Sequence, residues 1–361
     1  NPASYSAVDS LTFLFDAGMS LQNANFQEKG VKTNAKNSTI DYIAMQFRLW
    51  ERMGMTLGFL PYSTVGYNMS QTKTVSSDEY GNQISSLSTY SGDGGLQQVF
   101  AGLGFKVFKN LSIGANFSYF YGEINHSVKT IFNNTNANSS VRADKIEISD
   151  YKLDLGMQYT QPFGKKHTVN LGLVYSLGHD LNGKGYNFKE TYASGVSYPM
   201  TQTVDTIKNA FSLPHTLGIG ATYVYDRRLT VGVDYTLQKW EDVEFFNEKG
   251  KFLNRTKISF GAEYLPNPIS RNYLSRIRYR AGAYYSDPYT KVNGKESARE
   301  YGVSFGFGLP LEVFQSRSLL NISGQYVKVS PKVKGMLEES YLRINLGLTF
   351  NDRWFMKWKV E

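Results

Sequence analysis

The chain has 361 residues, no cysteine, 15% aromatic residues (26 Tyr and 23 Phe) and a formal net charge of +8. The absence of cysteine excludes a disulfide scaffold, a thiol enzyme and a CxxC metal site. No apolar run reaches the length of about 18 residues that a transmembrane helix needs. Because the Lys and Arg residues form no basic run, the charge indicates solvated loops and turns rather than a nucleic-acid surface.

Strict alternation of apolar and polar residues recurs along the chain, whereas helical spacing is almost absent. It is clear in the first such stretch, LTFLFDAGMSLQ, and it returns in residues 168–175, 216–225 and 300–309. In each stretch one side is apolar and the other is rich in Gly, Ser, Thr, Asn and charge. The apolar sides comprise Phe13, Phe15, Ala17, Met19 and Leu21, then Val169, Leu171, Leu173 and Tyr175, then Leu217, Ile219, Ala221, Tyr223 and Tyr225, and finally Tyr301, Val303, Phe305, Phe307 and Leu309.

The length of these stretches separates a membrane barrel from a soluble sandwich. Strands of soluble proteins average about five or six residues, and these run to roughly ten or more, ending in Tyr, Phe and Trp. A lipid-facing wall with aromatic girdles has this pattern. Because every backbone polar group must be paired inside a bilayer, such strands must close into a barrel.

Short and long links alternate between the predicted strands. Short turns on the periplasmic side and long loops outside are typical of bacterial barrels, whose strand number is even. The sequence therefore predicts an all-β fold, a single antiparallel transmembrane β-barrel of about 14 strands. The short links lie near 50–54, 108–112, 161–167, 225–229, 265–272 and 311–318, and the long ones near 25–38, 73–95, 127–145, 181–212, 242–255, 287–298 and 330–340.

One domain, residues 1–361, is expected, because no linker or low-complexity segment divides the chain. Residues 186–207 alternate only weakly, and we assign them to a long extracellular loop over 181–212, since another strand there would break the even count. The opening, NPASYSAVDS, has no start Met or signal peptide, which indicates a mature or trimmed product. Residues 1–10 are then a periplasmic lead-in.

Pro61 interrupts the alternating stretch MGMTLGFLPYSTVGYNMS, residues 53–70. Proline has no N–H to give to a sheet, so it belongs at edges, bulges and strand starts. At about 3.3 Å per residue it lies roughly 25 Å above the turn at 50–54, near mid-membrane once tilt is allowed for. Gly58 and Gly66 supply slack on either side. Either Pro61 marks a kink in the third strand or it occupies a tolerated bulge.

Strand parity also predicts what lines the lumen. A mixture of polar and apolar side chains suits an amphipathic ligand better than a water-filled pore. The charges either pair with one another to brace the lumen or receive an anionic head group, above all the arginines of RIRYR. The predicted apolar lining is Leu14, Leu60, Tyr62, Phe100, Phe120, Val174 and Tyr284; the predicted cations are Arg48, Lys106, Arg276, Arg278, Arg280 and Arg343; the remaining polar positions are Asp16, Gln46, Lys152, Asp154, Asp234 and Glu263.

Enzymatic function finds little support in the sequence. GVSFG matches the G-x-S-x-G pattern, but a nucleophile elbow needs a strand-to-helix turn and Ser304 is expected in mid-strand. The four histidines are dispersed and show no metal-binding spacing. No catalytic residue, metal or cofactor is therefore expected.

Two stretches carry a resemblance to a known family. The chain opens with NPASYSAVDSLTF, and in LPHTLGIGATYVYDRRLTVGVDYTLQKW, residues 213–240, a Pro precedes a Gly-rich strand and an Asp-Tyr strand ends in Trp. The first stretch is similar to the Asn-Pro-Ala segment that follows the plug and leads into the first strand of the FadL/TodX family, outer-membrane channels for long-chain fatty acids and other hydrophobic compounds. The second is similar to a late hairpin of that family. The plug itself, which precedes the Asn-Pro-Ala segment in the family, is not part of this sequence.

The resemblance implies passive uptake of hydrophobic compounds across the bacterial outer membrane. In the family an inward kink in the third strand opens a lateral window into the bilayer, which would give Pro61, with Gly58 and Gly66, that role. A second hypothesis is that the barrel serves as a partner or scaffold subunit of a larger outer-membrane machine, as some FadL-like barrels of Bacteroidota do. The composition, rich in Asn, Lys and Tyr, would suit that phylum. Expected partners are therefore lipid, hydrophobic small molecules and other outer-membrane proteins, and no nucleic acid.

Overall fold

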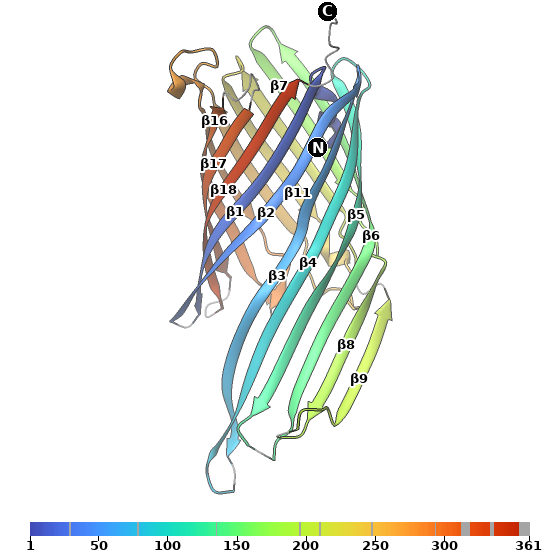
Figure 1. Cartoon of the computed structure of the whole chain (residues 1–361), viewed down its shortest axis with the longest axis vertical. Helices are drawn as coiled ribbons and strands as arrows, with labels where there is room; N and C mark the ends of the chain where they lie inside the picture. Colours follow the sequence, from blue (N-terminus) through green and yellow to red (C-terminus); the bar gives the residue numbers. More distant parts are fainter. Residues whose placement is uncertain are drawn as a thin grey trace, which may run out of the picture.

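The computed structural model of this chain describes residues 1–28, 30–77, 79–134, 136–194, 196–208, 211–246, 248–292, 294–311, 318–332 and 336–353. Within these residues, fourteen antiparallel strands form a closed barrel, as predicted. Strand β1 pairs with β18, and the ring closes through the pairing of β5 with β6. Figure 1 shows the strands tilted around the barrel, with the N-terminus and the end of β18 toward the same end of it. The barrel strands are β1 (Thr12–Glu28), β2 (Val31–Trp50), β3 (Met53–Ser77), β4 (Gln83–Lys106), β5 (Leu111–Phe132), β6 (Ser139–Phe163), β7 (His167–Ser176), β10 (Thr216–Tyr225), β11 (Leu229–Gln238), β12 (Arg255–Tyr264), β13 (Arg278–Ser286), β16 (Ala298–Leu311), β17 (Ser318–Pro331) and β18 (Glu338–Arg353).

The predicted lipid-facing sides lie on the outer surface of the barrel. Phe305 is 70% exposed, Phe117 60% and Ile219 51%, although all three are large and apolar. A wall of this kind is stable only against lipid, because exposed apolar patches of this extent are rare on soluble proteins. The chain is therefore an outer-membrane β-barrel. In the described residues, no helix is both long enough and apolar enough to span a membrane.

Strands β3 to β6 continue far beyond the barrel at its extracellular end and form a projecting sheet (Figure 1). β3 and β6 each have 25 residues, whereas β7 and β10 on the other side of the ring have 10. Most of the predicted long links at 25–38, 73–95 and 127–145 are therefore strand, and the prediction of loops there was wrong. Residues 68–77 of β3 are exposed and mainly polar, so the apolar alternation of the membrane wall does not continue there although the backbone pairing with β4 does.

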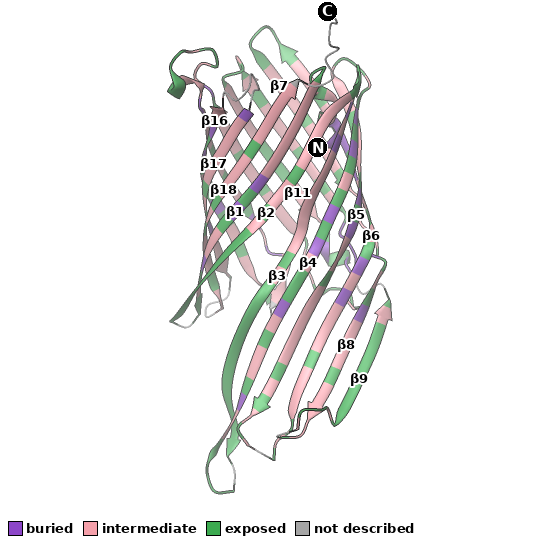
Figure 2. Cartoon of the chain, in the orientation of Figure 1, coloured by how far each residue is buried: buried purple, intermediate pink, exposed green. Residues whose placement is uncertain are grey.

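The segment 181–212, predicted to be a loop, contains a hairpin of two further strands, β8 and β9. β6 pairs with β7 inside the barrel but with β8 in the projecting sheet. The hairpin thus lies outside the ring, and the even strand count is kept. Figure 2 shows β9, at the end of the projecting sheet, as mainly exposed. The elements that are not strands of the barrel wall are β8 (Gly183–Tyr192), β9 (Thr201–Lys208), β14 (Lys291–Val292), β15 (Lys295–Glu296) and the 3-10 helices η1 (Pro2–Ala7), η2 (Trp240–Asp242) and η3 (Tyr273–Arg276).

The short links match the predicted periplasmic turns at 50–54, 108–112, 161–167 and 225–229, whereas the link predicted at 265–272 runs over 265–277 and contains helix η3. The sixth predicted turn falls largely on residues 312–317, and the end of the chain on 354–361; both lie outside the described residues.

Candidate functional site

The lumen is occupied at its periplasmic end by the first residues of the chain. Helix η1 rests on a row of glycines, one from each of four adjacent strands, that face one another in register across the inner wall. A Cβ at Gly114 would lie 2.4 Å from the carbonyl carbon of Pro2, and one at Gly54 only 1.9 Å from the carbonyl oxygen of Tyr5. Only glycine allows this approach of backbone to backbone. We call this row the glycine ladder: Gly54, Gly104, Gly114 and Gly156.

Polar contacts fix the segment on the ladder. The side-chain amide of Asn1 donates to the carbonyl oxygens of Met157 (2.8 Å) and Leu173 (3.2 Å). Gln46 donates to the carbonyl oxygen of Tyr5 at 3.2 Å. The Asn-Pro-Ala segment was predicted to be a periplasmic lead-in, and the structure instead seats it inside the barrel mouth. Sequence reasoning missed the ladder, because its glycines are far apart in the chain and only strand register aligns them.

A buried apolar cluster lies on β4, β5 and β6 nearer the extracellular end. Phe120 has no exposed surface, and the ring of Tyr62 packs edge-on against it at 4.7 Å between centroids. Leu181 and Leu213, from the links on either side of the β8–β9 hairpin, are folded inward onto the cluster. Tyr62 and Phe120, predicted to line the lumen for a substrate, are thus covered by the chain itself. The cluster comprises Leu96, Phe120, Ile146, Ile148, Leu181 and Leu213, with Tyr62, Ile124, Phe211, Phe245 and Phe246 packed against it.

The charged row RIRYR is braced by one carboxylate. Glu263 accepts hydrogen bonds from the Nη1 atom of Arg278 (2.6 Å) and the Nε atom of Arg280 (2.7 Å). Arg280 also donates to the Oδ1 atom of Asn321 at 2.7 Å. Of the two readings offered by the sequence, this geometry fits mutual pairing of lumen charges. Arg276 does not lie on the strand: it ends helix η3, with its guanidinium 5.5 Å from the ring centre of Tyr273.

The remaining predicted cations lie apart from one another. Lys106 is exposed at the periplasmic end of β4, and Arg48 donates to Ser10 at 2.7 Å near the same rim. Arg343, on β18, donates from Nη2 to the side-chain oxygen of Gln22 at 2.6 Å. Lys152 and Asp154 pair with each other on β6. The predicted set is therefore distributed over several levels of the lumen and does not form a single head-group site.

Tyr284 lies at the extracellular end of the lumen, beside a cavity of about 480 Å³. Its hydroxyl donates to Glu300 at 2.5 Å, and the Nζ atom of Lys257 lies 4.6 Å from its ring centre. Asp287, in the link that follows β13, lines the cavity. A hydrogen bond from the Thr256 hydroxyl lowers the pKa of this carboxyl below its usual range. The mouth of the barrel thus combines an aromatic side chain with carboxylates.

The hydrogen-bonded pairing between β2 and β3 ends just before Pro61 in the chain, and the sheet opens there. The last pair between these strands is Ile43 with Phe59; further on, β2 pairs only with β1 and β3 only with β4. Figure 1 shows the two strands diverging here. Because β3 has no partner on the β2 side at Pro61, the missing N–H removes no ladder bond on that side.

We call the opening between β2 and β3 the seam. Each of the two strands bends away from it through a bulge. On β3 the pairing with β4 shifts between Pro61 and Ser63, which leaves Tyr62 to turn its ring into the lumen. On β2 the pairing with β1 shifts at the level of Asp41. Bulges bend and twist a strand, so two at one level account for the divergence. Of the predicted slack residues, Gly58 makes room for the ring of Phe100, and Gly66 faces the opening.

A cavity of about 500 Å³ lies at this opening, and its lining is largely polar. Asp41 accepts from the hydroxyl of Ser20 at 2.8 Å on one side. Within the described part of the chain, the hydrogen bonds of Arg343 go to the neutral amide of Gln22 rather than to a carboxylate. Leu60 and Leu14, predicted as lining, belong to neighbouring levels of β3 and β1 and do not border this cavity. The cavity is lined by Ser20, Gln22, Asn37, Thr39, Asp41, Pro61, Tyr62, Ser63, Thr64, Gly66 and Arg343.

The family model of BamG matches residues 1–361, the whole chain. The chain belongs to the BamG family. No curated protein is similar enough in sequence to count as a relative.

Solved structures share the fold of this BamG-family barrel at low sequence identity. The monoaromatic hydrocarbon channel CymD has a TM-score of 0.63 and 13% identity, covering 98% of this chain and 91% of its own. The P. putida toluene transporter TodX has a TM-score of 0.62 and 13% sequence identity, and the match covers 99% of this chain and 93% of TodX. A Pseudomonas aeruginosa FadL homologue has a TM-score of 0.61 and 13% sequence identity, and the match covers 98% of this chain and 93% of the homologue. The predicted FadL-like fold is confirmed, and Ser304 lies within strand β16, as expected for a position without a nucleophile elbow.

Proposed function

We propose that the chain is a channel for passive uptake of hydrophobic or amphipathic compounds, such as long-chain fatty acids. The compound would bind in the lumen and leave sideways, between β2 and β3, into the membrane. The observation that carries this proposal is the end of β2–β3 pairing at Phe59, beside a cavity that includes Pro61. The likeness of the fold to hydrophobic-compound channels supports it.

The lining of the cavity favours an amphipathic compound over a purely apolar one. Arg343 presents a guanidinium whose described partner is a neutral amide, so it is the lumen cation best placed to receive a carboxylate. Arg278 and Arg280 already share the carboxylate of Glu263. A fatty acid would place its head group at Arg343 and its tail toward the seam.

Closing the seam covalently should block uptake. In a continued register Asp41 would face Pro61, and the chain has no native cysteine to interfere. We expect oxidation of the double variant Asp41→Cys/Pro61→Cys to lower uptake of a radiolabelled long-chain fatty acid at least about tenfold, and reduction to restore it. Uptake is measured in cells that lack other channels of this kind.

The matched control is Met45→Cys/Leu57→Cys, a pair that already faces across the closed part of the same two strands. Its oxidation should leave uptake unchanged. Full uptake by the oxidised seam variant would remove the lateral route. Uptake by the wild type no higher than in empty cells would remove the transport function itself.

A second function, as a subunit of a larger outer-membrane assembly, is favoured by the projecting sheet. β9 pairs only with β8 in the described residues, so one edge of this strand is open to strand addition by a partner protein. The apolar cluster around Phe120, which the chain itself covers, also fits a barrel that need not conduct.

Deletion of the β8–β9 hairpin should then release the protein from an assembly while leaving the barrel folded. The measurement is blue-native electrophoresis of cross-linked membranes, with heat-modifiable migration as the folding control. We expect a shift of the wild-type complex to the size of the free barrel. A wild-type chain that migrates alone, or a complex unchanged by the deletion, would contradict this role.

A further inference from the structure

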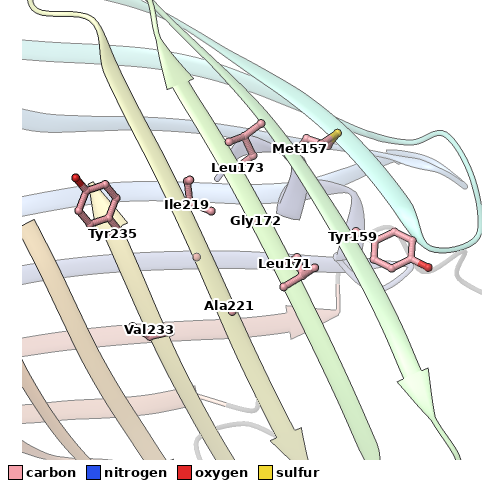
Figure 3. Close-up of a pocket in the computed structure, with 10 residues that line it drawn as sticks. Met157, Tyr159, Leu171, Gly172, Leu173, Ile219, Ala221, Val233 and Tyr235 are labelled. Atoms are coloured by element: carbon pink, nitrogen blue, oxygen red, sulfur yellow. The ribbon is translucent and has the colours of Figure 1, made fainter. Parts of the chain in front are cut away.

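An apolar groove lies on the outer wall of the barrel, where β6, β7, β10 and β11 run side by side (Figure 3). Its volume is about 550 Å³. Gly172, Gly220 and Ala221 contribute no side chain larger than a methyl group, and longer apolar side chains surround them. These are Met157, Tyr159, Leu171, Leu173, Ile219, Val233 and Tyr235.

Strand parity places the groove on the lipid side. Gly156 and Gly172 approach Asn1 on the luminal side, so the residues next to them, such as Met157 and Leu171, point outward. Ala221 faces Leu171 on one neighbouring strand and Val233 on the other. A single methyl between two branched side chains leaves a depression in an otherwise filled apolar wall.

Four cations lie at the periplasmic end of the same strands. The turns 164–166 and 226–228 lie against each other, since the backbone N–H of Asp226 donates to the carbonyl oxygen of Lys166 at 2.6 Å. Asp226 is 3.9 Å from the Nζ atom of Lys166 and 3.8 Å from the Nε atom of Arg228. With exposed Lys165 and Arg227 added, positive charge exceeds this one carboxylate. We call the four residues Lys165, Lys166, Arg227 and Arg228 the cationic turns.

An aromatic group connects the cationic turns with the groove. Tyr223 lies two positions from Ala221, and its hydroxyl is 2.6 Å from the Nδ1 atom of His167. The ring of His167 lies 5.1 Å from that of Tyr225. Rings with an apolar body and a polar edge are typical of the boundary between head groups and acyl chains. From the periplasmic end toward the middle of the membrane, the outer wall thus presents the cationic turns, then the aromatic rings, then the apolar groove.

The distance from the groove at Ala221 to the cationic turns fits the thickness of one leaflet of the membrane. Asp226 lies five positions after Ala221, which is about 17 Å of extended chain at about 3.3 Å per residue. Half of a hydrocarbon core of about 30 Å is similar in length. We propose that these features form a binding site for an anionic glycerophospholipid of the periplasmic leaflet. The phosphate contacts the cationic turns, and one acyl chain lies in the groove over Ala221.

Native mass spectrometry of the purified barrel tests the site directly. The probes are dimyristoyl phosphatidylglycerol and dimyristoyl phosphatidylcholine, each titrated in the same detergent. We expect one phosphatidylglycerol to bind at least about fivefold more tightly than phosphatidylcholine, from the attraction of juxtamembrane cations for anionic lipid. Arg227→Glu should remove this preference, and Ala221→Leu, which fills the hollow, should weaken binding of phosphatidylglycerol about fivefold.

Matched controls separate this site from general lipid coating. Arg52→Glu reverses an exposed cation on another periplasmic turn, and Ala283→Leu enlarges an exposed alanine on β13; both should bind as the wild type does. Equal binding of the two lipids by the wild type, or equal losses in test and control variants, would overturn the proposal. Displacement of the lipid by millimolar inorganic phosphate alone would assign the turns to a free anion instead.

Discussion

Gly114→Leu is expected to expel the Asn1–Ala7 segment from the barrel. The new Cβ would lie 2.4 to 2.6 Å from backbone atoms of Pro2 and Ala3, which cannot rotate aside as a side chain would. Release of the segment also breaks the hydrogen bonds of Asn1 to β6 and β7. The periplasmic mouth of the lumen should then open.

Cysteine labelling measures this release. Ala3 is fully buried on the ladder, and Ala3→Cys gives the chain a single thiol. We expect a maleimide to label it at least about a hundredfold faster when Gly114→Leu is also present, since a group protected only by local opening reacts in proportion to the open population. The control is Gly261→Leu, on the inner face of β12, where a Cβ would meet nothing within 4 Å. A thiol that stays protected in Gly114→Leu would show that the ladder tolerates a side chain and that β5 shifts instead.

Phe120→Ala should cause the largest loss of stability of any single truncation in the lumen. The side chain is fully buried, and both the ring of Tyr62 and the inward-folded links pack on it. Truncation of a buried Phe to Ala typically costs about 3–5 kcal/mol, because transfer energy is lost and a cavity remains. Urea unfolding of the barrel in detergent micelles measures the change in the free energy of unfolding.

Phe117→Ala is the matched control on the same strand. Phe117 points to the lipid and is 60% exposed, so lipid or detergent replaces the removed atoms and leaves no cavity. Its loss of stability should be clearly smaller. Equal losses at the two positions would mean that the luminal cluster contributes no more to the free energy of unfolding than the outer wall does. The links on either side of the β8–β9 hairpin could then move away from Phe120 with little loss of stability.

These two predictions bear on both proposed functions. A compound that enters from the extracellular end must displace the links on either side of the β8–β9 hairpin from Phe120 before it reaches the opening between β2 and β3. Helix η1 lies on the periplasmic side of that opening, so it blocks only passage straight through the lumen. A channel with a lateral exit therefore needs the cover over Phe120 to open easily while η1 stays in place, whereas a scaffold subunit gains from both closures being strong. The measured cost of Phe120→Ala and the labelling rate of Ala3→Cys in the otherwise unchanged barrel bear on these two cases.

The sequence by itself determined the barrel, its outer wall and its short turns. Alternation within Thr12–Leu21 or Leu217–Tyr225 reports the side of a strand that meets lipid, because the bilayer tolerates no polar side chains there. Pro61 likewise indicated an interruption in the third strand, since a missing N–H is a property of the residue itself. Of the arginines in RIRYR, Arg278 and Arg280 lie on β13 and bond Glu263, whereas Arg276 ends helix η3.

Only the tertiary structure decided what fills and surrounds that barrel. Residues 68–77 and 201–208 are mainly polar, so they carry no apolar period that would reveal the far end of the projecting sheet or strand β9. The glycine ladder, the Glu263 brace and the inward-folded links bring together residues from strands far apart in the chain, and register across the sheet determines these contacts. The seam beside Pro61 is of the same kind: it required bulges on two strands at one level, and a single strand cannot show where its neighbour leaves it.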